Sequence, residues 1–380
     1  MNDLSFLTIR EVQEGYKAKK FSATELLKSC LAQIDKLDKS LRAFLFVENK
    51  EKLLEQTKLV DQKITQGLEL RPLEGMPLAL KDLYSTSEVL TTAGSKIIDD
   101  YLPPFDATAT RCLKEAGAII IGKTNEDAWG HGSSGENSDI APTRNPWDLS
   151  RVPGGSSSGS GAAVAGGECL AATGTDTGSS VRLPAAFCNL TGIKPTYGRV
   201  SRYGIIAMAS SLDTIGHITR DVYDNALILG VTAGKDERDA SSSPKPVPGY
   251  LSLLERPVKK LTIGMPKDYF PKELDSRIKK LTLEAIKLLE KEGAVIKEVE
   301  LPHTKYAMAC YYILVPSEVS SNLARFDGIR YGHKRSQFGA EAKRRIMLGT
   351  YTLSAGYVDA YYKKAQRIRT LVKQDFEKAL

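Results

Sequence analysis

Three short segments carry residue types that could perform acyl-transfer chemistry together. Residues 75–82 form an apolar stretch that ends in Lys81, and burial lowers the proton affinity of an amine until it can act as a base near neutral pH. Residues 154–161 are an unbroken run of glycine and serine. Residues 174–184 contain a glycine turn beside serines, which is how backbone N–H groups form an oxyanion hole. Taken singly, these segments have ordinary explanations, because lysines at strand ends are usually solvated and Gly/Ser runs are usually loops. The presence of all three segments in one chain is what favours a catalytic site.

Two further motif matches do not fit their usual chemistry. Residues 117–124 satisfy G-x-x-x-x-G-K-[ST], but the isoleucines at 119–121 are strand material, whose N–H groups would be paired instead of facing a phosphate. Residues 155–159 match the G-x-S-x-G nucleophile elbow, which requires a preceding strand and a downstream histidine. The residues before the match, 150–154, are Ser-Arg-Val-Pro-Gly and do not have a strand pattern, so a Ser-His-Asp site is poorly supported. No histidine has metal-binding spacing such as H-E-x-x-H, so we expect all four to be structural or on the surface: His131, His217, His303 and His333.

The composition is that of a globular protein. The chain has 380 residues, of which 42% are hydrophobic and 26% charged, and this excludes disordered and collagen-like classes. No apolar run reaches the roughly 18 residues of a membrane span, and the N-terminal stretch lacks the apolar core of an export signal. Five scattered cysteines indicate free thiols in a reducing compartment. A net charge of +7 permits an RNA partner without requiring one.

The hydrophobic pattern alternates between strand and helix. Ser22 to Glu25 is a capping box, followed by apolar residues on one helical face. Further segments predict strands at 44–47, 76–80 and 118–121, with helices at 49–66 and 107–116. This alternation indicates an α/β fold with a mixed sheet.

Residues 130–220 are rich in Gly, Ser, Thr and Pro. Surface linkers share this composition, but apolar segments and isolated charges favour a tightly packed core in which backbone approaches backbone. Residues 235–248 read as a surface excursion. A second α/β section follows at about 255–380, with strands at 261–265 and 294–299, a helix at 275–292 and basic helices after them. The last residues stop within a helical pattern, so we expect the chain to be truncated.

The three segments occur in the order G-x-P-x-x-x-K-D, P-G-G-S-S-x-G-S and G-x-D-x-G-x-S-x-R-x-P, which resembles the amidase signature family. Four other segments are similar to one branch, the A subunits of bacterial glutamyl-tRNA(Gln)/aspartyl-tRNA(Asn) amidotransferases: residues 90–96, 142–146, 194–201 and 320–332. The resemblance covers essentially the whole chain. It implies one large domain of three sections (about 1–70, 71–220 and 255–380), with a mixed, mostly parallel twisted sheet covered by helices on both faces. The family domain normally continues beyond residue 380.

The resemblance also implies roles for individual residues. Ser180 would be the nucleophile, Ser156 would bridge nucleophile and base from a cis peptide bond, and Lys81 would be the proton acceptor, neutral at rest. The backbone N–H groups of residues 177–180 would form the oxyanion hole, and Arg182 would support that loop. The oxyanion-hole residues besides the nucleophile are Thr177, Gly178 and Ser179.

Substrate recognition is implied at four positions. Arg345 would bind the carboxylate of glutamine by bidentate pairing, and Ser133, Ser134 and Tyr311 would line the pocket. No metal is implied. The family usually has glycine where this chain has Ser158 and Ser179, and we expect Ser179 either to crowd the oxyanion loop or to require a φ that only glycine adopts easily.

The implied function is hydrolysis of glutamine to supply ammonia for converting Glu-tRNA(Gln), Asp-tRNA(Asn) or both to the amidated tRNAs. The implied partners are a B subunit, which would bind tRNA and use ATP and Mg, and a small C subunit, in a cytoplasmic heterotrimer. No cofactor is expected in this chain. Two alternatives stay open: a stand-alone amidase for small or acyl amides, and a catalytically weak scaffold subunit, suggested by Ser179 and the abrupt end.

Overall fold

The computed structural model describes residues 3–259 and 261–380 and forms two compact units. The first comprises Met1–Leu251 and Asn322–Arg344, and the second comprises Ser252–Ser321 and Arg345–Leu380. Each unit has its own sheet, and each is described by itself.

The N-terminal section of the first unit consists of helices, as the pattern predicted. Both capping boxes of this section are formed: Thr8 with Glu11, and Ser22 with Glu25, where the side chain of each partner accepts from the other's backbone N–H. These boxes fix where α1 and α2 begin, and Asn49 caps α3. The helices are α1 (Ile9–Lys17), α2 (Ala23–Leu41) and α3 (Lys50–Gln66).

The first unit is built on a six-stranded mixed sheet with the order β1-β3-β2-β4-β6-β5. The strand β2 pairs in parallel with both β3 and β4, whereas the β1–β3, β4–β6 and β5–β6 pairs are antiparallel. The strands are β1 (Phe44–Val47), β2 (Pro77–Lys81), β3 (Ile119–Thr124), β4 (Ala171–Asp176), β5 (Thr191–Ile193) and β6 (Thr214–Thr219).

The prediction of a mixed sheet is confirmed, but its parallel character needs a correction. Four of the six strands run in one direction, β2, β3, β4 and β5. Only two of the five pairs are parallel, however, because β1 lies antiparallel to β3 and β6 lies antiparallel between β4 and β5. Direction depends on how distant segments connect, which a strand's own sequence does not encode.

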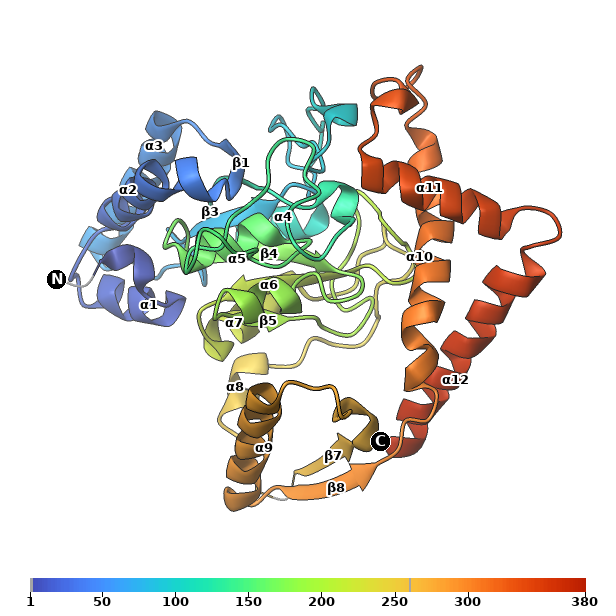
Figure 1. The fold of residues 1–380 in the computed structure, drawn as a ribbon. Coiled ribbons are helices and arrows are strands. Elements are labelled where there is room, and N and C mark those ends of the chain that lie inside the picture. The colour runs from blue at the N-terminus through green and yellow to red at the C-terminus, as the bar shows by residue number, and fades with distance from the viewer. Residues whose placement is uncertain (1–2, 260) are drawn as a thin grey trace. The chain divides into compact units, whose positions relative to one another are not determined.

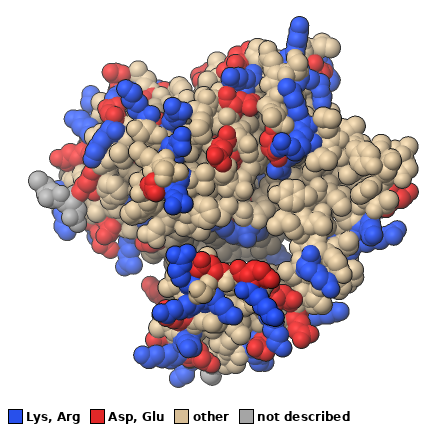
Figure 2. Space-filling view, viewed as in Figure 1, with Lys and Arg blue, Asp and Glu red and all other residues tan. Residues whose placement is uncertain are grey.

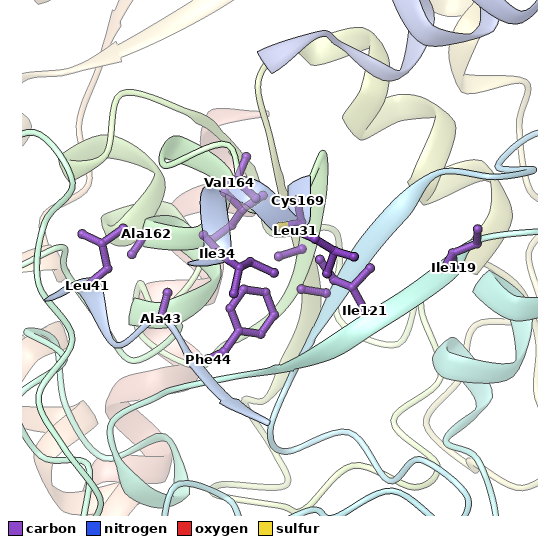
Figure 3. Close-up of a cluster of buried hydrophobic side chains, with 14 of the residues drawn as sticks. Leu31, Ile34, Leu41, Ala43, Phe44, Ile119, Ile121, Ala162, Val164 and Cys169 are labelled. Carbon is purple, nitrogen blue, oxygen red and sulfur yellow. The ribbon is translucent and has the colours of Figure 1, made fainter. Parts of the chain in front are cut away.

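One face of this sheet carries the main hydrophobic core. Side chains from α2, β1, β3 and the Gly/Ser-rich helix α5 (Ser158–Ala165) converge there (Figure 3). Leu31 and Ile34 of α2 meet Phe44 of β1 and Ile121 of β3, and all four are buried. Hydrophobic burial of this kind is the dominant favourable term in folding.

The opposite face is covered by other helices. On β6, Ile218 belongs to the main core, and its neighbour His217 points to the other face, because successive side chains on a strand alternate. The His217 ring shares a hydrogen bond of 2.9 Å with Thr232 of α7 (Val222–Thr232). Helices therefore cover both faces, as predicted. The remaining helices of this region are α4 (Thr108–Glu115) and α6 (Arg182–Phe187).

The Gly/Ser-rich stretch is packed core and not a linker, which confirms the preferred interpretation. Residues 158–164, which make up most of α5, are buried. A Cβ added at Gly159 would collide with the backbone of Ala43 and Asn125, so only glycine lets the helix approach this closely. By contrast, residues 235–248 are mostly exposed or half-buried, as expected of a surface excursion.

The second unit contains a parallel two-stranded sheet and long helices. Strands β7 (Thr262–Pro266) and β8 (Val295–Val299) pair in parallel, with α9 (Ser276–Lys291) as the crossover between them (Figure 1). Cys310 and Leu314 of α10 (Ala307–Asn322) pack against Ala365 of α12 (Lys364–Ala379). Two more helices, α8 (Tyr250–Leu254) and α11 (Ala340–Leu353), begin in the first unit and end in the second.

The unit boundary differs from the section predicted at 255–380, because residues 322–344 return to the first unit. The Asn322 side chain donates to the Met208 carbonyl at 3.0 Å, and the rings of Phe326 and Phe338 pack on Trp129 with centroids 4.8 and 5.6 Å away. These contacts join segments far apart in the sequence, which local periodicity cannot reveal.

The surface and the cysteines agree with the composition. Basic and acidic side chains are interspersed on the face in Figure 2, in keeping with the small net charge. All five cysteines are free thiols, as predicted. Among the described residues, no helix combines the length and apolar character needed to cross a bilayer.

The core makes a prediction about stability. Ile121→Ala removes a fully buried side chain from the cluster in Figure 3 and should lower the free energy of unfolding by about 2–5 kcal/mol. Ile140→Ala, at a site 51% exposed, should change it by less than about 0.5 kcal/mol. Urea denaturation followed by circular dichroism measures both, and equal effects would contradict this assignment of the core.

Candidate active site

Lys81 lies at the end of β2 with its side chain fully enclosed. Its Nζ donates to Ser156 Oγ at 2.8 Å and to Thr175 Oγ1 at 3.0 Å, and its backbone N–H donates to Thr173 Oγ1. Burial lowers the pKa of this amine, and the nearby carboxyl group of Glu126 opposes that shift. A buried lysine with a lowered pKa can lose its proton near neutral pH and act as a base.

Ser156 lies in the loop before α5, and its side chain is the first hydroxyl that the amine meets. The Gly155–Ser156 peptide bond is cis, as the resemblance implied. The Ser156 carbonyl accepts from Asp127 N–H at 3.1 Å, and the next residue, Ser157, donates its backbone N–H to the Ser180 carbonyl at 3.1 Å. The Gly/Ser loop is therefore bonded both to the segment after β3 and to the turn that carries Ser180.

Ser180 ends a turn that follows β4 directly. Residue 178 is exposed, residues 177 and 179 are half-buried, and Ser180 is 7% exposed. Within residues 3–259 and 261–380, no group accepts a hydrogen bond from the backbone N–H groups of residues 177–180. The turn thus offers a row of backbone donors next to a serine hydroxyl, the arrangement an oxyanion hole requires.

A bidentate ion pair braces this turn. Arg182 Nε and Nη2 donate to the two carboxylate oxygens of buried Asp176 at 3.0 and 2.9 Å, and Nη2 also donates to the Gly178 carbonyl at 3.2 Å. The Asp176 carboxylate also accepts from the backbone N–H groups of Val181 and Arg182. Charge-assisted pairs of this geometry fix orientation as well as adding stability.

Ser133 and Ser134 lie beside the Gly/Ser loop. Gly155 donates its backbone N–H to the Ser133 carbonyl at 2.9 Å. The loop that contains both serines is anchored by the Asp127 carboxylate, which accepts from the N–H groups of Gly135 and Asn137 at 3.1 and 2.9 Å. The structure therefore brings these two predicted residues next to Ser156.

The sequence profile of the family described as Amidase matches residues 25–380. The chain belongs to the amidase family.

Comparison with individual proteins agrees with this assignment. The chain is 51% identical over 392 residues to the A subunit of the glutamyl-tRNA(Gln) amidotransferase of Carboxydothermus hydrogenoformans, an alignment that covers 99% of this chain and 81% of that protein. The crystal structure of the corresponding A subunit from Thermotoga maritima matches with a TM-score of 0.81 and 39% identity, over 100% of this chain and 78% of that one. A peptide amidase from Stenotrophomonas maltophilia matches with a TM-score of 0.80 and 29% identity, over 95% and 78%.

The two departures from the family pattern do not distort this amidase. Ser179 does not have a positive φ, so the expectation that it needs a conformation reserved for glycine is wrong. Ser179 is half-buried and lies beside the exposed residue 178. Ser158 begins α5, and its hydroxyl shares a hydrogen bond of 3.2 Å with Thr143 Oγ1.

Tyr311 and Arg345 belong to the second unit of the amidase. Tyr311 lies on α10 with its ring edge-on to that of Tyr312, and Arg345 lies on α11 with its side chain buried. Their substrate-binding roles stay predictions.

Two acidic residues near the amine escaped the motif analysis. Asp213 accepts from Thr177 Oγ1 at 2.7 Å and from the N–H groups of Met208 and Ala209, and burial raises its pKa to about 6. Glu126 is fully buried, with Oε2 3.6 Å from Lys81 Nζ. The sequence feature that could have pointed to Glu126 is its place directly after a buried strand, β3. The ends of neighbouring parallel strands meet at one sheet edge, so a residue there lies near the end of β2.

The structure also accounts for the motif matches that were set aside. Residues 119–124 of the P-loop match form β3, and Lys123 is buried with Nζ donating to the Tyr84 carbonyl and Thr91 Oγ1 at 2.7 Å each. Burial lowers the pKa of His217 to about 3, and its bond to Thr232 makes it a structural residue. These observations argue against a phosphate loop and against His217 as a catalytic base.

In the part of the chain that the structure describes, one group of side chains lies close enough together to be a candidate metal site. Asp99, Asp100 and His333 bring ligand atoms within 4.8 Å of one another, but all three are exposed and His333 already bonds Asp99 at 2.7 Å. Exposed acidic clusters of this kind are common without an ion.

The brace on the turn is testable. Arg182→Ala leaves the buried Asp176 carboxylate without its bidentate partner, which should cost about 1–3 kcal/mol of folding stability. Arg182→Lys keeps the charge but loses the fork geometry, so its effect should be intermediate. Urea denaturation measures all three proteins, and an alanine variant as stable as the unsubstituted chain would show that the pair does not brace the turn.

Proposed function

We propose that this amidase is the glutaminase subunit of a tRNA-dependent amidotransferase. It would release ammonia from glutamine for the amidation of Glu-tRNA(Gln), Asp-tRNA(Asn) or both. The observation that carries the chemistry is the 2.8 Å hydrogen bond between the enclosed Lys81 amine and Ser156, in a loop bonded directly to the Ser180 turn. The substrate class is supported by the 51% identity to a protein named as the A subunit of a glutamyl-tRNA(Gln) amidotransferase.

In the proposed reaction, Ser180 Oγ attacks the carboxamide carbon of glutamine. Its proton passes to Ser156 Oγ as the proton of Ser156 passes to Lys81 Nζ, so the hydroxyls carry the proton to the amine. The C–N bond then breaks, and the relay returns the proton to the leaving nitrogen as ammonia departs. A water molecule, activated by the same relay, hydrolyses the glutamyl ester to glutamate and restores Ser180.

The turn would stabilise the charge that develops on the carbonyl oxygen. The N–H groups of Thr177, Gly178, Ser179 and Ser180 are the proposed donors, with the Arg182–Asp176 pair holding them in place. Donors that are already fixed in place stabilise an oxyanion without reorganising during the reaction. Ser133 and Ser134 are proposed pocket residues because their loop is bonded to Gly155. The pocket roles of Tyr311 and Arg345 rest on the family resemblance alone.

The proposal includes partners. A B subunit would bind tRNA and use ATP with Mg, and a C subunit would complete a cytoplasmic heterotrimer. One alternative has a specific observation in its favour: a peptide amidase shares the fold with a TM-score of 0.80, so a stand-alone amidase could use the same relay. A weak scaffold role is disfavoured, because the backbone of Ser179 is not forced into a glycine conformation.

The nucleophile is tested by substitution. Ser180→Ala should abolish ammonia release from glutamine, because it removes the hydroxyl proposed to form the acyl-enzyme, and the circular dichroism spectrum should be unchanged. Ser150→Ala, at an exposed serine away from the turn, is the matched control and should keep full activity. Ammonia is measured with a coupled dehydrogenase assay. Activity of Ser180→Ala close to that of the unsubstituted chain would assign the chemistry to another nucleophile.

The substrate class is tested with the chain and its partners. Glutamine should be turned over much faster than a simple amide such as propionamide, and co-expression with B and C subunits of a related amidotransferase should yield a purified complex. Faster turnover of propionamide, together with no complex on size-exclusion chromatography, would instead support a stand-alone amidase.

A further inference from the structure

Glu126 is a carboxyl group enclosed in the interior next to the catalytic amine, and it has no part in the relay proposed above. It follows β3 by two residues, and its side chain is completely buried. Its Oε2 lies 3.6 Å from Lys81 Nζ, and neither of its oxygens accepts a hydrogen bond from any residue in 3–259 or 261–380. A buried carboxylate normally requires several donors, so a negative charge on Glu126 is compensated chiefly when Lys81 is protonated.

The other carboxyl groups near the amine differ from Glu126 in this respect. Each accepts backbone N–H groups that stabilise a negative charge: Asp82 from Thr92 and Gly94, Asp127 from Gly135 and Asn137, and Asp213 from Met208 and Ala209. Glu126 is therefore the carboxyl group in this cluster whose charge depends on the protonation of Lys81.

The amine itself has room for such a partner. An ammonium group carries three donors. Two of them are directed to Ser156 and Thr175, at 2.8 and 3.0 Å, and Glu126 is the next acceptor at 3.6 Å. The three partners come from three different segments, the Gly/Ser loop, β4 and the end of β3, so the ammonium position is fixed from several directions.

We propose that Glu126 is a positioning residue for the relay: its carboxylate is the counter-ion of the Lys81 ammonium that forms when Ser180 gives up its proton. This inference rests on the proposed function and extends it. A carboxylate that orients a catalytic base and stabilises its protonated form plays the same part in the Ser-His-Asp triad. Here the ammonium would form on a fully buried side chain, where an unpaired charge is strongly disfavoured.

The electrostatic surroundings link the charges of the two groups. Burial raises the pKa of Glu126 to about 8 and lowers that of Lys81, so it disfavours the charge on each group, whereas the charge of each group favours that of the other. The other charged groups that act on Glu126 are Asp82, Lys123 and Asp127, and those that act on Lys81 are Asp127 and Asp213. Lys123 is paired with Asp82 at 3.4 Å and donates to two other oxygens, so it does not replace Lys81 as the partner of Glu126.

The sign of the effect follows from the charge. An ionised Glu126 favours the charged form of Lys81 and so raises the pKa of the amine. Because the neutral amine is the reactive form, reactivity appears as the pH rises through that pKa. Removing the carboxylate should therefore move the acidic limb of the pH profile to lower pH. It should also reduce the maximal rate, because the ammonium that forms during the reaction loses its counter-ion.

The experiment follows the sulfonylation of Ser180 by phenylmethanesulfonyl fluoride, which does not depend on glutamine or on partner subunits. The Ser180 oxygen forms a bond to sulfur, fluoride leaves, and the serine proton passes to Lys81. The rate is measured by intact-protein mass spectrometry from pH 5 to pH 10 (about five units, to bracket both groups). Ser180→Ala identifies the labelled residue.

Glu126→Gln should shift the acidic limb down by about one pH unit or more and lower the plateau rate about 10- to 100-fold. Glu126→Asp keeps a carboxylate and should restore part of both. Glu126→Met offers an apolar side chain of similar size, which keeps the test valid if a buried amide prevents folding. Glu168→Gln is the matched control, because Glu168 is equally buried, its oxygens also accept no hydrogen bond in the described chain, and the charge acting on it is that of Asp38.

The outcomes separate this inference from the proposed function. A shift of the acidic limb of the pH profile to lower pH in Glu126→Gln and Glu126→Met, but not in Glu168→Gln, supports Glu126 as the counter-ion of Lys81. Labelling of Ser180 with an unmoved limb in the folded Glu126 variants overturns this inference and leaves the relay intact. An unsubstituted chain that never labels at Ser180 overturns the relay, and the counter-ion with it.

Discussion

The enclosure of one lysine amine is the constraint on which the site depends. Lys81 is completely buried, yet its Nζ has two hydroxyl partners within 3.0 Å and a carboxyl group at 3.6 Å. Burial disfavours the charged amine, and these partners limit how far that preference goes. A lysine in water would stay protonated at neutral pH and could not accept a proton from a serine. The surrounding packing therefore has a chemical purpose as well as a structural one.

The sheet explains why the groups of the site meet. Strands β3, β2 and β4 lie side by side and run in parallel, so all three end at the same edge. Lys81 ends β2, Glu126 follows β3, and the Ser180 turn follows β4. Crevices at the carboxyl ends of parallel strands are the usual location of functional sites in α/β folds. The Gly/Ser loop brings Ser156 to Lys81 at this edge. Its small residues let α5 approach the neighbouring backbone closely.

The proposed amidase site differs from a serine–histidine site in the residue that serves as the base. A histidine titrates near neutrality in water, whereas a lysine has to be buried before it can do so. A buried base needs its protonated form to be stabilised, and the nearest charged group able to do this is the Glu126 carboxyl. In the proposed mechanism, the proton relay and the ion pair are two parts of one electrostatic arrangement, whose groups come from three separate segments of the fold.

Local sequence determined a large part of this protein. The capping boxes, the apolar runs and the Gly/Ser-rich turns fixed where most helices and strands lie, and the order of three motifs pointed to Lys81, Ser156 and Ser180. The reason is that capping, periodicity and turn chemistry act over a few residues. The tertiary structure decided the strand directions, the return of residues 322–344 to the first unit, and the place of Glu126. Lys81 bonds a serine 75 residues away and pairs with a glutamate 45 residues away (126 − 81), and long-range packing of this kind leaves no periodic signal in the chain.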